Sequence, residues 1–254
     1  MINTGGNSKI ALSTDEGTIA CNLYSPEGMN LVAQLWMKLS MQYRRMYDVS
    51  WLGIPIVQLP EDIVTMQELL WRTRPDVVVE TGIAHGGSLI LSASILELMG
   101  HGKVVGVDVE IRKHNRVAMD AHPLRHRIHL IEGSSTSPEV VEQVRAHCAG
   151  ASRVLVLLDS NHQREHVARE LELYHSLVTP DSYIVAMDGA QGFAWDLPRG
   201  KPEWRDDNPL PAIAEFLKRH PEFVVDPHWT RLGITSSPDG YLRRVPLESA
   251  GGSR

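Results

Sequence analysis

Short runs of apolar, β-branched residues recur through the middle of the chain, each followed by a longer stretch of helical length. Runs of roughly four to eight such residues are typical of buried strands, whereas helices are usually longer. We therefore predict strands over residues 76–81, 104–109, 127–131, 154–158 and 182–186. Apolar strands that alternate with helices indicate a parallel sheet covered on both faces. The pattern predicts an α/β fold with a mostly parallel central sheet.

Helices fill the stretches between these strands and also precede the first one. Those after the strands are predicted over residues 88–99, 115–121, 138–148, 162–177 and 211–219. Ahead of the sheet, apolar residues at Leu31, Leu35 and Leu39 predict a helix over about 25–47. A proline opens another predicted helix over 60–73. The chain is expected to end with strands over 223–225, 232–235 and 241–245, the last after a turn at 237–240.

One domain accounts for most of the chain. No internal repeat or low-complexity linker divides its 254 residues. We predict a single domain over 23–247, with a helical part over 23–74 and the sheet-containing core over 75–247. The polar and glycine-containing ends, 1–22 and 248–254, are predicted to be flexible.

The composition of the chain indicates which classes of binding partner to expect. The formal net charge is −6 without any basic run, so nothing favours binding to nucleic acid or to a membrane surface. The sequence has no apolar run of bilayer-spanning length, and its first 17 residues lack the apolar core of a signal peptide. The two cysteines, Cys21 and Cys148, cannot form a disulfide framework. We therefore expect a cytoplasmic protein whose partner is a small molecule.

The turn after the first predicted strand carries the clearest ligand-binding pattern. Residues 80–88 read ETGIAHGGS, and glycines permit a sharp turn and close approach of a ligand to the backbone. The spacing differs from the G-x-G-x-x-G of dinucleotide sites, which disfavours a nicotinamide-dependent oxidoreductase. Asp108 ends the next strand, where a carboxylate commonly binds ribose hydroxyls. Each feature alone fits an ordinary turn and a solvated Asp, but together they predict a nucleoside ligand.

Polar residues also follow the third, fourth and fifth predicted strands, at the edge where ligands bind in open α/β sheets. Ser134 and Ser135 form a small polar loop that either lies beside the ligand or caps the next helix. Asp159 and His162 follow the fourth strand, and Asp188 follows the fifth. We expect these three side chains to gather at one edge as a general base, a metal site or both.

These motifs resemble the cephalosporin hydroxylase and rhamnosyl O-methyltransferase family. The resemblance runs from residue 23 to about 245 and rests on QLPED at 58–62, ETGIAHGGS at 80–88, GVD at 106–108, IR at 111–112, IEGSS at 131–135, LDSNH at 158–162 and HV at 166–167. It implies a Rossmann-like class I methyltransferase core, S-adenosylmethionine as cofactor, and a homo-oligomer. It also implies a bacterial specialised-metabolite pathway, such as antibiotic biosynthesis, or a glycolipid pathway.

The resemblance also implies roles for individual residues. The expected cofactor contacts are Glu80, Gly82, His85, Gly86, Gly87, Ser88, Asp108, Val109, Arg112, Ser134, Ser135 and Asp159. The expected catalytic residues are His162, Asp188 and Asp159, with His162 as the candidate base and His166 packed one helical turn further on. Rhamnosyl-type members hold a divalent metal, usually Mg²⁺, on acids that correspond to Asp159 and Asp188.

One departure from the family pattern affects this metal. The family places Glu-Asp after the fifth strand, where this chain has Met187-Asp188. A thioether does not replace a carboxylate as a ligand of Mg²⁺. The sequence therefore favours a metal-free transfer, to an aromatic, indole-like carbon or to a hydroxyl served by His162. The alternatives are Mg²⁺-dependent O-methylation of a deoxysugar hydroxyl, as in rhamnosyl-type members, and a non-catalytic partner subunit of an oxidation system.

Aromatic residues outside the core are the candidate acceptor contacts. They precede the core at Tyr24, Tyr43, Tyr47 and Trp51, and they follow the fifth strand at Phe193, Trp195 and Trp204. The last three lie in 192–208, a long connection that we predict to be a lid. From this set we predict Tyr24, Trp51 and Trp195 as acceptor contacts. Such residues suit a flat or apolar acceptor. The alternative for each of them is packing in the core or between subunits.

Overall fold

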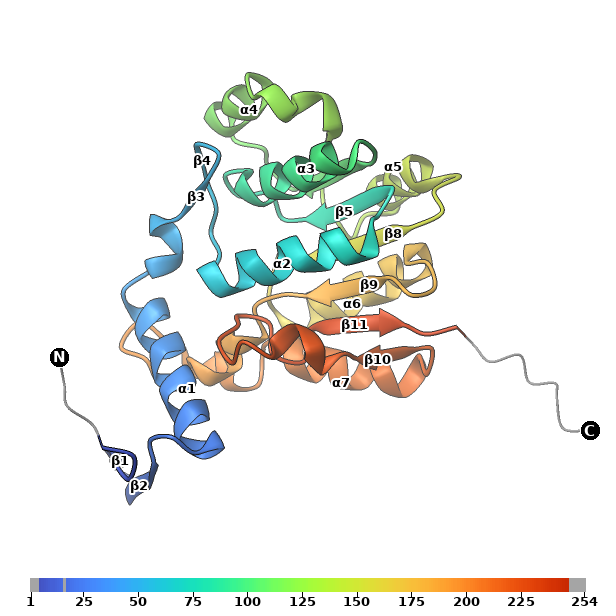
Figure 1. The fold of residues 1–254 in the computed structure, drawn as a ribbon. Coiled ribbons are helices and arrows are strands. Elements are labelled where there is room, and N and C mark those ends of the chain that lie inside the picture. Colours follow the sequence, from blue (N-terminus) through green and yellow to red (C-terminus); the bar gives the residue numbers. More distant parts are fainter. Residues whose placement is uncertain (1–4, 16, 247–254) are drawn as a thin grey trace, which may run out of the picture.

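The computed structural model describes residues 5–15 and 17–246 and is built around one seven-stranded sheet (Figure 1). The strand order is β10-β11-β9-β8-β5-β6-β7. The parallel strands are β5 (Val77–Thr81), β6 (Lys103–Asp108), β7 (Ile128–Glu132), β8 (Val154–Leu158) and β9 (Tyr183–Ala186). β11 (Tyr241–Arg244) runs antiparallel between β9 and β10 (Phe223–Val225). The predicted mostly parallel sheet is confirmed.

Helices cover both faces of the sheet, because successive residues of each strand point to opposite faces. On one face, α2 (Pro60–Thr73) and α3 (Gly87–Met99) form a core with Val78 of β5. On the other face, Val77 and Val79 pack with α5 (Pro138–Cys148), α6 (Arg164–Tyr174) and α7 (Pro209–Arg219). Figure 1 shows α2 and α3 in front of the strands. α4 (Lys113–Asp120) follows β6.

Local sequence sets where several helices begin. Ser137 and Asn208 precede prolines, and their side chains accept hydrogen bonds from the first turns of α5 and α7. α7 therefore starts at Pro209, slightly before the predicted 211. Short 3-10 helices occupy Arg45–Asp48, Pro123–Arg127, His175–Leu177, Gly189–Phe193, Pro202–Arg205 and Pro227–Thr230.

Three predicted elements differ from the structure. α1 (Pro26–Gln42) ends before residue 47, because Arg44 adopts a left-handed φ of 54°. The helix predicted over 162–177 begins only at Arg164, so His162 lies in the preceding loop. The predicted strand over 232–235 is wrong. Thr235 and Ser236 instead donate hydrogen bonds to the buried Asp62.

Two antiparallel hairpins are additional to the predicted elements. β1 (Lys9–Thr14) pairs with β2 (Gly17–Asn22), and β3 (Ser50–Trp51) pairs with β4 (Ile54–Pro55). β1 and β2 are largely exposed, so burial imposes no strong apolar alternation on their sequences. They form a defined element inside the segment that the sequence predicts to be flexible. The predicted flexible tail, 248–254, lies outside the described residues.

α1 lies beside the sheet-containing core, at the end of the molecule that carries β1 and β2 (Figure 1). Its buried residue Met37 packs with Leu59 and Ala190. Its other side exposes large apolar residues such as Trp36 and Leu39. No helix within residues 5–15 and 17–246 has both the length and the apolar character needed to span a bilayer.

Candidate active site

The glycine turn lies against the end of β8. Gly82 follows β5 with a φ of +87°, a conformation that residues with a side chain rarely adopt. A Cβ at this position would lie 2.1 Å from the carbonyl oxygen of Asp159, so no larger residue fits without displacement. The N–H of Gly82 donates to the carbonyl of Val107 at 2.8 Å, and that of Asp159 donates to the carbonyl of Thr81 at 2.8 Å. The turn therefore sits between the ends of β6 and β8.

The second half of the turn packs onto α4 and the β3–β4 hairpin. Gly86 has a φ of +95°, and a Cβ there would lie 2.3 Å from Sδ of Met119. Asn115 Nδ2 donates to the carbonyl of Ala84 at 2.7 Å. A Cβ at Gly87 would meet the carbonyl oxygen of Pro55. Gly86 and Gly87 thus allow close packing that shapes the turn.

Asp108 is tied to this turn through its carboxylate. Its Oδ2 accepts hydrogen bonds from the N–H groups of Ile83 at 2.8 Å and Ala84 at 3.4 Å, and its Oδ1 accepts one from Glu110 at 3.0 Å. A carboxylate has about four acceptor positions, so Asp108 keeps about one for a ribose hydroxyl. The carboxylate is therefore held in place at the position predicted for ribose binding.

Glu80 lies beneath the turn rather than in it. It is 1% exposed and accepts a hydrogen bond from the Ser88 hydroxyl. Burial raises the pKa of Glu80 to about 7, and the bond from Ser88 opposes this rise. Its second oxygen, Oε2, has no hydrogen-bond partner within the described part of the chain. Glu80 and Ser88 support the start of α3 from inside the protein.

A cavity of about 470 Å³ opens beside the turn. Its lining residues are Tyr47, Val57, Ala84, His85, Asp108, Val109, Glu110, Arg112, Asn115, Asp159, Ser160, His162 and Asp188. A neighbouring cavity of about 240 Å³ is lined by Gly82, Val107, Asp108, Val109, Ser134, Ser135, Ser160, Asn161 and His166. The two together contain most of the predicted cofactor contacts. The predicted contacts that line neither cavity are Glu80, Gly86, Gly87 and Ser88.

A hydrogen-bond network joins the loops after β7 and β8. Nε2 of His166 lies 3.3 Å from Oγ of Ser135 and 3.0 Å from Oγ of Ser160, and Ser160 donates to Glu170 at 2.8 Å. His162 lies before α6, with its Nε2 3.2 Å from Oδ2 of Asp188. The prediction that His162 and His166 lie one turn apart on the same helix is therefore wrong, because only His166 lies in α6.

Asp159, His162 and Asp188 form one cluster, as the sequence predicts. One possible metal-ligand atom from each side chain lies within 4.8 Å of the other two. Burial raises the pKa of Asp159 well above its usual range, and the negative charges of Asp188, Glu80, Glu170 and Asp62 raise it further. This edge of the sheet therefore holds more negative charge than its own cationic groups neutralise. A proton or a cation would relieve the excess.

Met187 takes no part in this cluster. Its side chain is 3% exposed and packs in the core on the α2 and α3 face. The remaining donor set of two carboxylates and an imidazole fits a divalent cation. Mg²⁺ is usually held by only one or two carboxylates and completes its shell with water and substrate oxygens. Loss of the family's Glu is therefore compatible with a metal.

A further cavity of about 300 Å³ adjoins the cluster. It is lined by Met41, Arg44, Met46, Tyr47, Val57, Gln58, Leu59, His162, Asp188, Arg199, Trp204 and Ser236. His162 and Asp188 line this cavity and also the larger one beside Asp108. The catalytic candidates thus stand at the boundary between a cofactor cavity and a candidate acceptor cavity.

The three aromatic residues predicted to bind the acceptor lie elsewhere. Nε1 of Trp51 donates to Ser94 of α3 at 3.0 Å, and Tyr24 precedes α1 and is 57% exposed. Trp195 lies against the guanidinium of Arg205. None of the three lines either cavity at His162, so the structure does not support their predicted role.

Tyr47 and Trp204 are the aromatic residues that line the acceptor cavity. Both belong to the wider set of candidate aromatic residues in the sequence, although neither is among the three predicted acceptor contacts.

The predicted lid, 192–208, borders this cavity and is bonded to two other elements. Lys38 of α1 pairs with Asp196 at 2.5 Å, and the N–H of Arg164 at the start of α6 donates to Asp207 at 2.7 Å. The segment supplies Arg199 and Trp204 to the cavity lining. Its opening and closing stay a prediction.

Known proteins resemble this chain in sequence and in fold. Residues 43–245 match the family model described as Rhamnosyl O-methyltransferase/CmcI. The rhamnosyl O-methyltransferase of Mycobacterium bovis is 29% identical over 200 residues, 77% of this chain and 78% of that protein. The one of Mycobacterium leprae is 28% identical over 199 residues, 77% of this chain and 82% of that protein.

Two solved structures of CmcI share the fold. An apo form superposes with a TM-score of 0.57 and a Mg–SAM form with 0.56, each at 19% identity and covering 79% of this chain and 78% of that chain. With the sheet order described above, this likeness defines a Rossmann-like class I methyltransferase fold. The chain belongs to the rhamnosyl O-methyltransferase/CmcI family of S-adenosylmethionine-dependent methyltransferases.

Replacing Asp108 with Asn should weaken the binding of S-adenosylhomocysteine by roughly ten- to a hundredfold, because hydrogen bonds to a charged acceptor contribute about 1.5–3 kcal/mol. Titration calorimetry measures the affinity. Glu132→Gln is the matched control, since Glu132 pairs with Asp108 in the register of β6 and β7 but lines neither cofactor cavity. An Asp108→Asn variant with wild-type affinity would contradict the assigned cofactor site.

The stability of the wild type should fall with rising pH relative to that of Glu80→Gln. The native Glu80 carboxyl holds its proton up to a pKa of about 7, whereas the unfolded chain releases it near 4.5. The native state binds more protons between these values, so the free energy of unfolding declines across them. The rise in the pKa of Glu80 on folding corresponds to a loss of about 3 kcal/mol in the free energy of unfolding across this pH range. Denaturant titrations at several pH values measure it, and parallel profiles for the two proteins would refute the prediction.

Proposed function

We propose that this chain methylates a hydroxyl group of a small, sugar-like acceptor, with S-adenosylmethionine as methyl donor and a divalent cation at Asp159 and Asp188. The observation that carries the proposal is the position of the Asp159–His162–Asp188 cluster between the cofactor cavity and the acceptor cavity. Deprotonation of a hydroxyl needs a base or a cation beside it, and the cluster offers residues for both. The names of the mycobacterial relatives support the same acceptor class.

His162 is the proposed base. Its Nε2 lies 3.2 Å from Oδ2 of Asp188, so a neutral ring that donates to this carboxylate keeps Nδ1 free to accept a proton. Asp188 therefore orients the ring of His162.

S-adenosylmethionine, when bound, supplies an electrophilic methyl group, and Mg²⁺, when bound, lowers the pKa of a coordinated hydroxyl. The chain itself aligns donor and acceptor. Asp108 and the glycine turn hold the nucleoside, while Arg199, Tyr47 and Trp204 enclose the acceptor. Proximity and alignment of this kind account for much of the barrier reduction in a group transfer.

Metal-free transfer to an aromatic, indole-like carbon is the second candidate. The acceptor cavity contains Tyr47, Trp204, Met41 and Met46, which offer flat and apolar surface to an aromatic ring. An electron-rich carbon needs no deprotonation before it attacks, and His162 would then remove the ring proton afterwards. The departure at Met187 also favours this candidate.

Transfer of a labelled methyl group to a panel of deoxysugar glycosides and indole derivatives separates the candidates. We expect transfer to a deoxysugar hydroxyl that stops with EDTA and resumes with Mg²⁺. Transfer to an indole ring that survives EDTA would replace the proposal by the second candidate. A protein that binds the cofactor but methylates nothing in the panel would fit the non-catalytic partner subunit.

His162→Ala should lower kcat by roughly a hundredfold or more, as expected for loss of a general base. The affinity for S-adenosylhomocysteine should change far less. Gln163→Ala is the matched control, because Gln163 follows in the same loop but lines neither of the two cavities at His162. A His162→Ala variant with wild-type kcat would exclude His162 as the base.

We also propose that the chain forms a homo-oligomer through α1. The exposed side of this helix carries large apolar residues spaced three or four positions apart, namely Met29, Val32, Trp36, Leu39 and Tyr43. A continuous exposed apolar stripe is typical of a surface that another chain covers. The same stripe on a second copy is a self-complementary partner.

Trp36→Glu should reduce the oligomeric mass of the protein, because it places a charge in the middle of the apolar stripe. Sedimentation velocity measures the mass. Trp71→Glu on α2 is the control, since Trp71 is 48% exposed and Trp36 is 43% exposed. A monomeric wild type would refute the proposed assembly.

A further inference from the structure

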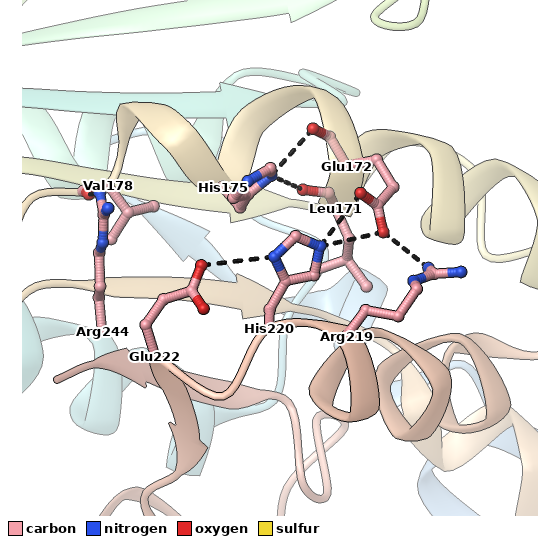
Figure 2. Close-up of polar contacts among 8 residues, drawn as sticks. All are labelled: Leu171, Glu172, His175, Val178, Arg219, His220, Glu222 and Arg244. Carbon is pink, nitrogen blue, oxygen red and sulfur yellow. Dashed lines mark hydrogen bonds and ion pairs between the residues drawn. The ribbon is translucent and has the colours of Figure 1, made fainter. Parts of the chain in front are cut away.

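A second cluster of metal-binding side chains lies at the other end of α6 from the active site (Figure 2). It consists of Glu172 in the last turn of α6, His175 directly after that helix, and His220 directly after α7. One possible ligand atom from each lies within 4.8 Å of the other two. His162 precedes α6, which is 11 residues and therefore about 16 Å long, so the two clusters are distinct.

His175 presents one ring nitrogen without a proton. Its Nδ1 lies 2.9 Å from the carbonyl oxygen of Glu172 and 3.2 Å from that of Leu171. A carbonyl oxygen only accepts hydrogen bonds, so Nδ1 carries the proton and the lone pair of the neutral ring is on Nε2. Metal-binding histidines commonly donate their second N–H to a backbone carbonyl in this way. The arrangement therefore prepares His175 to bind a metal through Nε2.

His220 lies between two carboxylates, as Figure 2 shows. Its Nδ1 is 3.4 Å from Oε1 of Glu222, and its Nε2 is 3.1 Å from Oε2 of Glu172. Both ring nitrogens of His220 therefore face carboxylate oxygens, and a cation held by Nε2 and Glu172 would replace the hydrogen bond on that side. Phe216 stacks on the ring at 4.3 Å and fixes its plane.

The charges around the cluster also suit a cation. The Glu222 carboxylate lies against Nδ1 of His220, on the side of the ring away from Glu172. Arg219 donates to Oε1 of Glu172 at 2.6 Å and stabilises that carboxylate. Oε2 of Glu172 still faces His220.

We propose that Glu172, His175 and His220 bind a zinc ion that joins the end of α6 to the end of α7. Two imidazoles and a carboxylate are ligands that zinc accepts, whereas Mg²⁺ and Ca²⁺ prefer oxygen alone. Ligand atoms of a tetrahedral zinc site lie about 3.3 Å apart, a spacing that Nε2 of His220 and Oε2 of Glu172 already approach at 3.1 Å. Water or Glu222 fills the fourth position. An ion held only by the native state stabilises the fold.

Calorimetric titration of the full-length, tag-free protein with zinc chloride tests this site. Saturating Mg²⁺ and S-adenosylhomocysteine are present to occupy the active-site acids. We expect one zinc ion per chain and a melting temperature that rises by several degrees. The double variant His175→Gln/His220→Gln, which keeps polar side chains of similar size, should lose at least tenfold in zinc affinity and the rise in melting temperature.

Two control variants show where the zinc ion is bound. The control His101→Gln/His126→Gln alters two histidines outside the cluster and should bind zinc as the wild type does. His162→Gln should also bind it normally, and loss of binding in that variant would move the ion to the active site and overturn the proposal. A wild type without zinc binding, or an unchanged His175→Gln/His220→Gln variant, would overturn it too. Unaltered affinity for S-adenosylhomocysteine verifies that each variant is folded.

Discussion

Close contact between the backbones of Gly82 and Asp159 determines the geometry of the active-site edge. A Cβ at Gly82 would lie 2.1 Å from the carbonyl oxygen of Asp159, so any side chain there would separate the turn from the end of β8. The same turn donates two backbone N–H groups to Asp108. One glycine therefore fixes the distance between Asp108, the proposed nucleoside-binding carboxylate, and Asp159, the proposed catalytic one. Alignment of a methyl donor with its acceptor depends on that distance.

Acidic side chains gather around Asp159, where Gly82 and the end of β8 meet. Asp159 is surrounded by Asp188, Glu80, Glu170 and Asp62, and burial raises the pKa of Glu80 to about 7 and that of Asp62 to about 6. Carboxylates that remain neutral or uncompensated inside a protein lower its stability, so such groups gather mainly where function requires them. A cation at Asp159 and Asp188 would offset this cost and activate a hydroxyl at the same time. The electrostatics of the free protein and the chemistry of the proposed reaction thus favour the same ion.

The sequence predicts the residues at this edge because they follow strands that are easy to recognise. Val77–Thr81 and Val154–Leu158 are buried throughout and contain the apolar runs 77–79 and 154–158, and their pairing places Asp159 next to the turn. The alternation of side chains between the two faces of a sheet also indicates which way Met187 points. Ala186 packs on one face of the sheet and Met187 on the other, so Met187 points into the core. Strand patterns could not select the acceptor contacts from the candidate aromatic residues, because Tyr47 and Trp204 lie in short 3-10 helices that only the tertiary fold brings to His162.

The two histidine-containing clusters at the ends of α6 differ in the ions they select. Asp159 and Asp188 offer oxygen ligands, which suit Mg²⁺, whereas His175 and His220 offer nitrogen ligands, which suit zinc. With both proposed ions bound, a strong chelator would remove both and would therefore affect catalysis at one end of the helix and stability at the other. Added Mg²⁺ would restore only the oxygen site. Recovery of methyl transfer without recovery of the melting temperature would thus assign catalysis to the carboxyl edge of the sheet and the stabilising ion to the junction of α6 and α7.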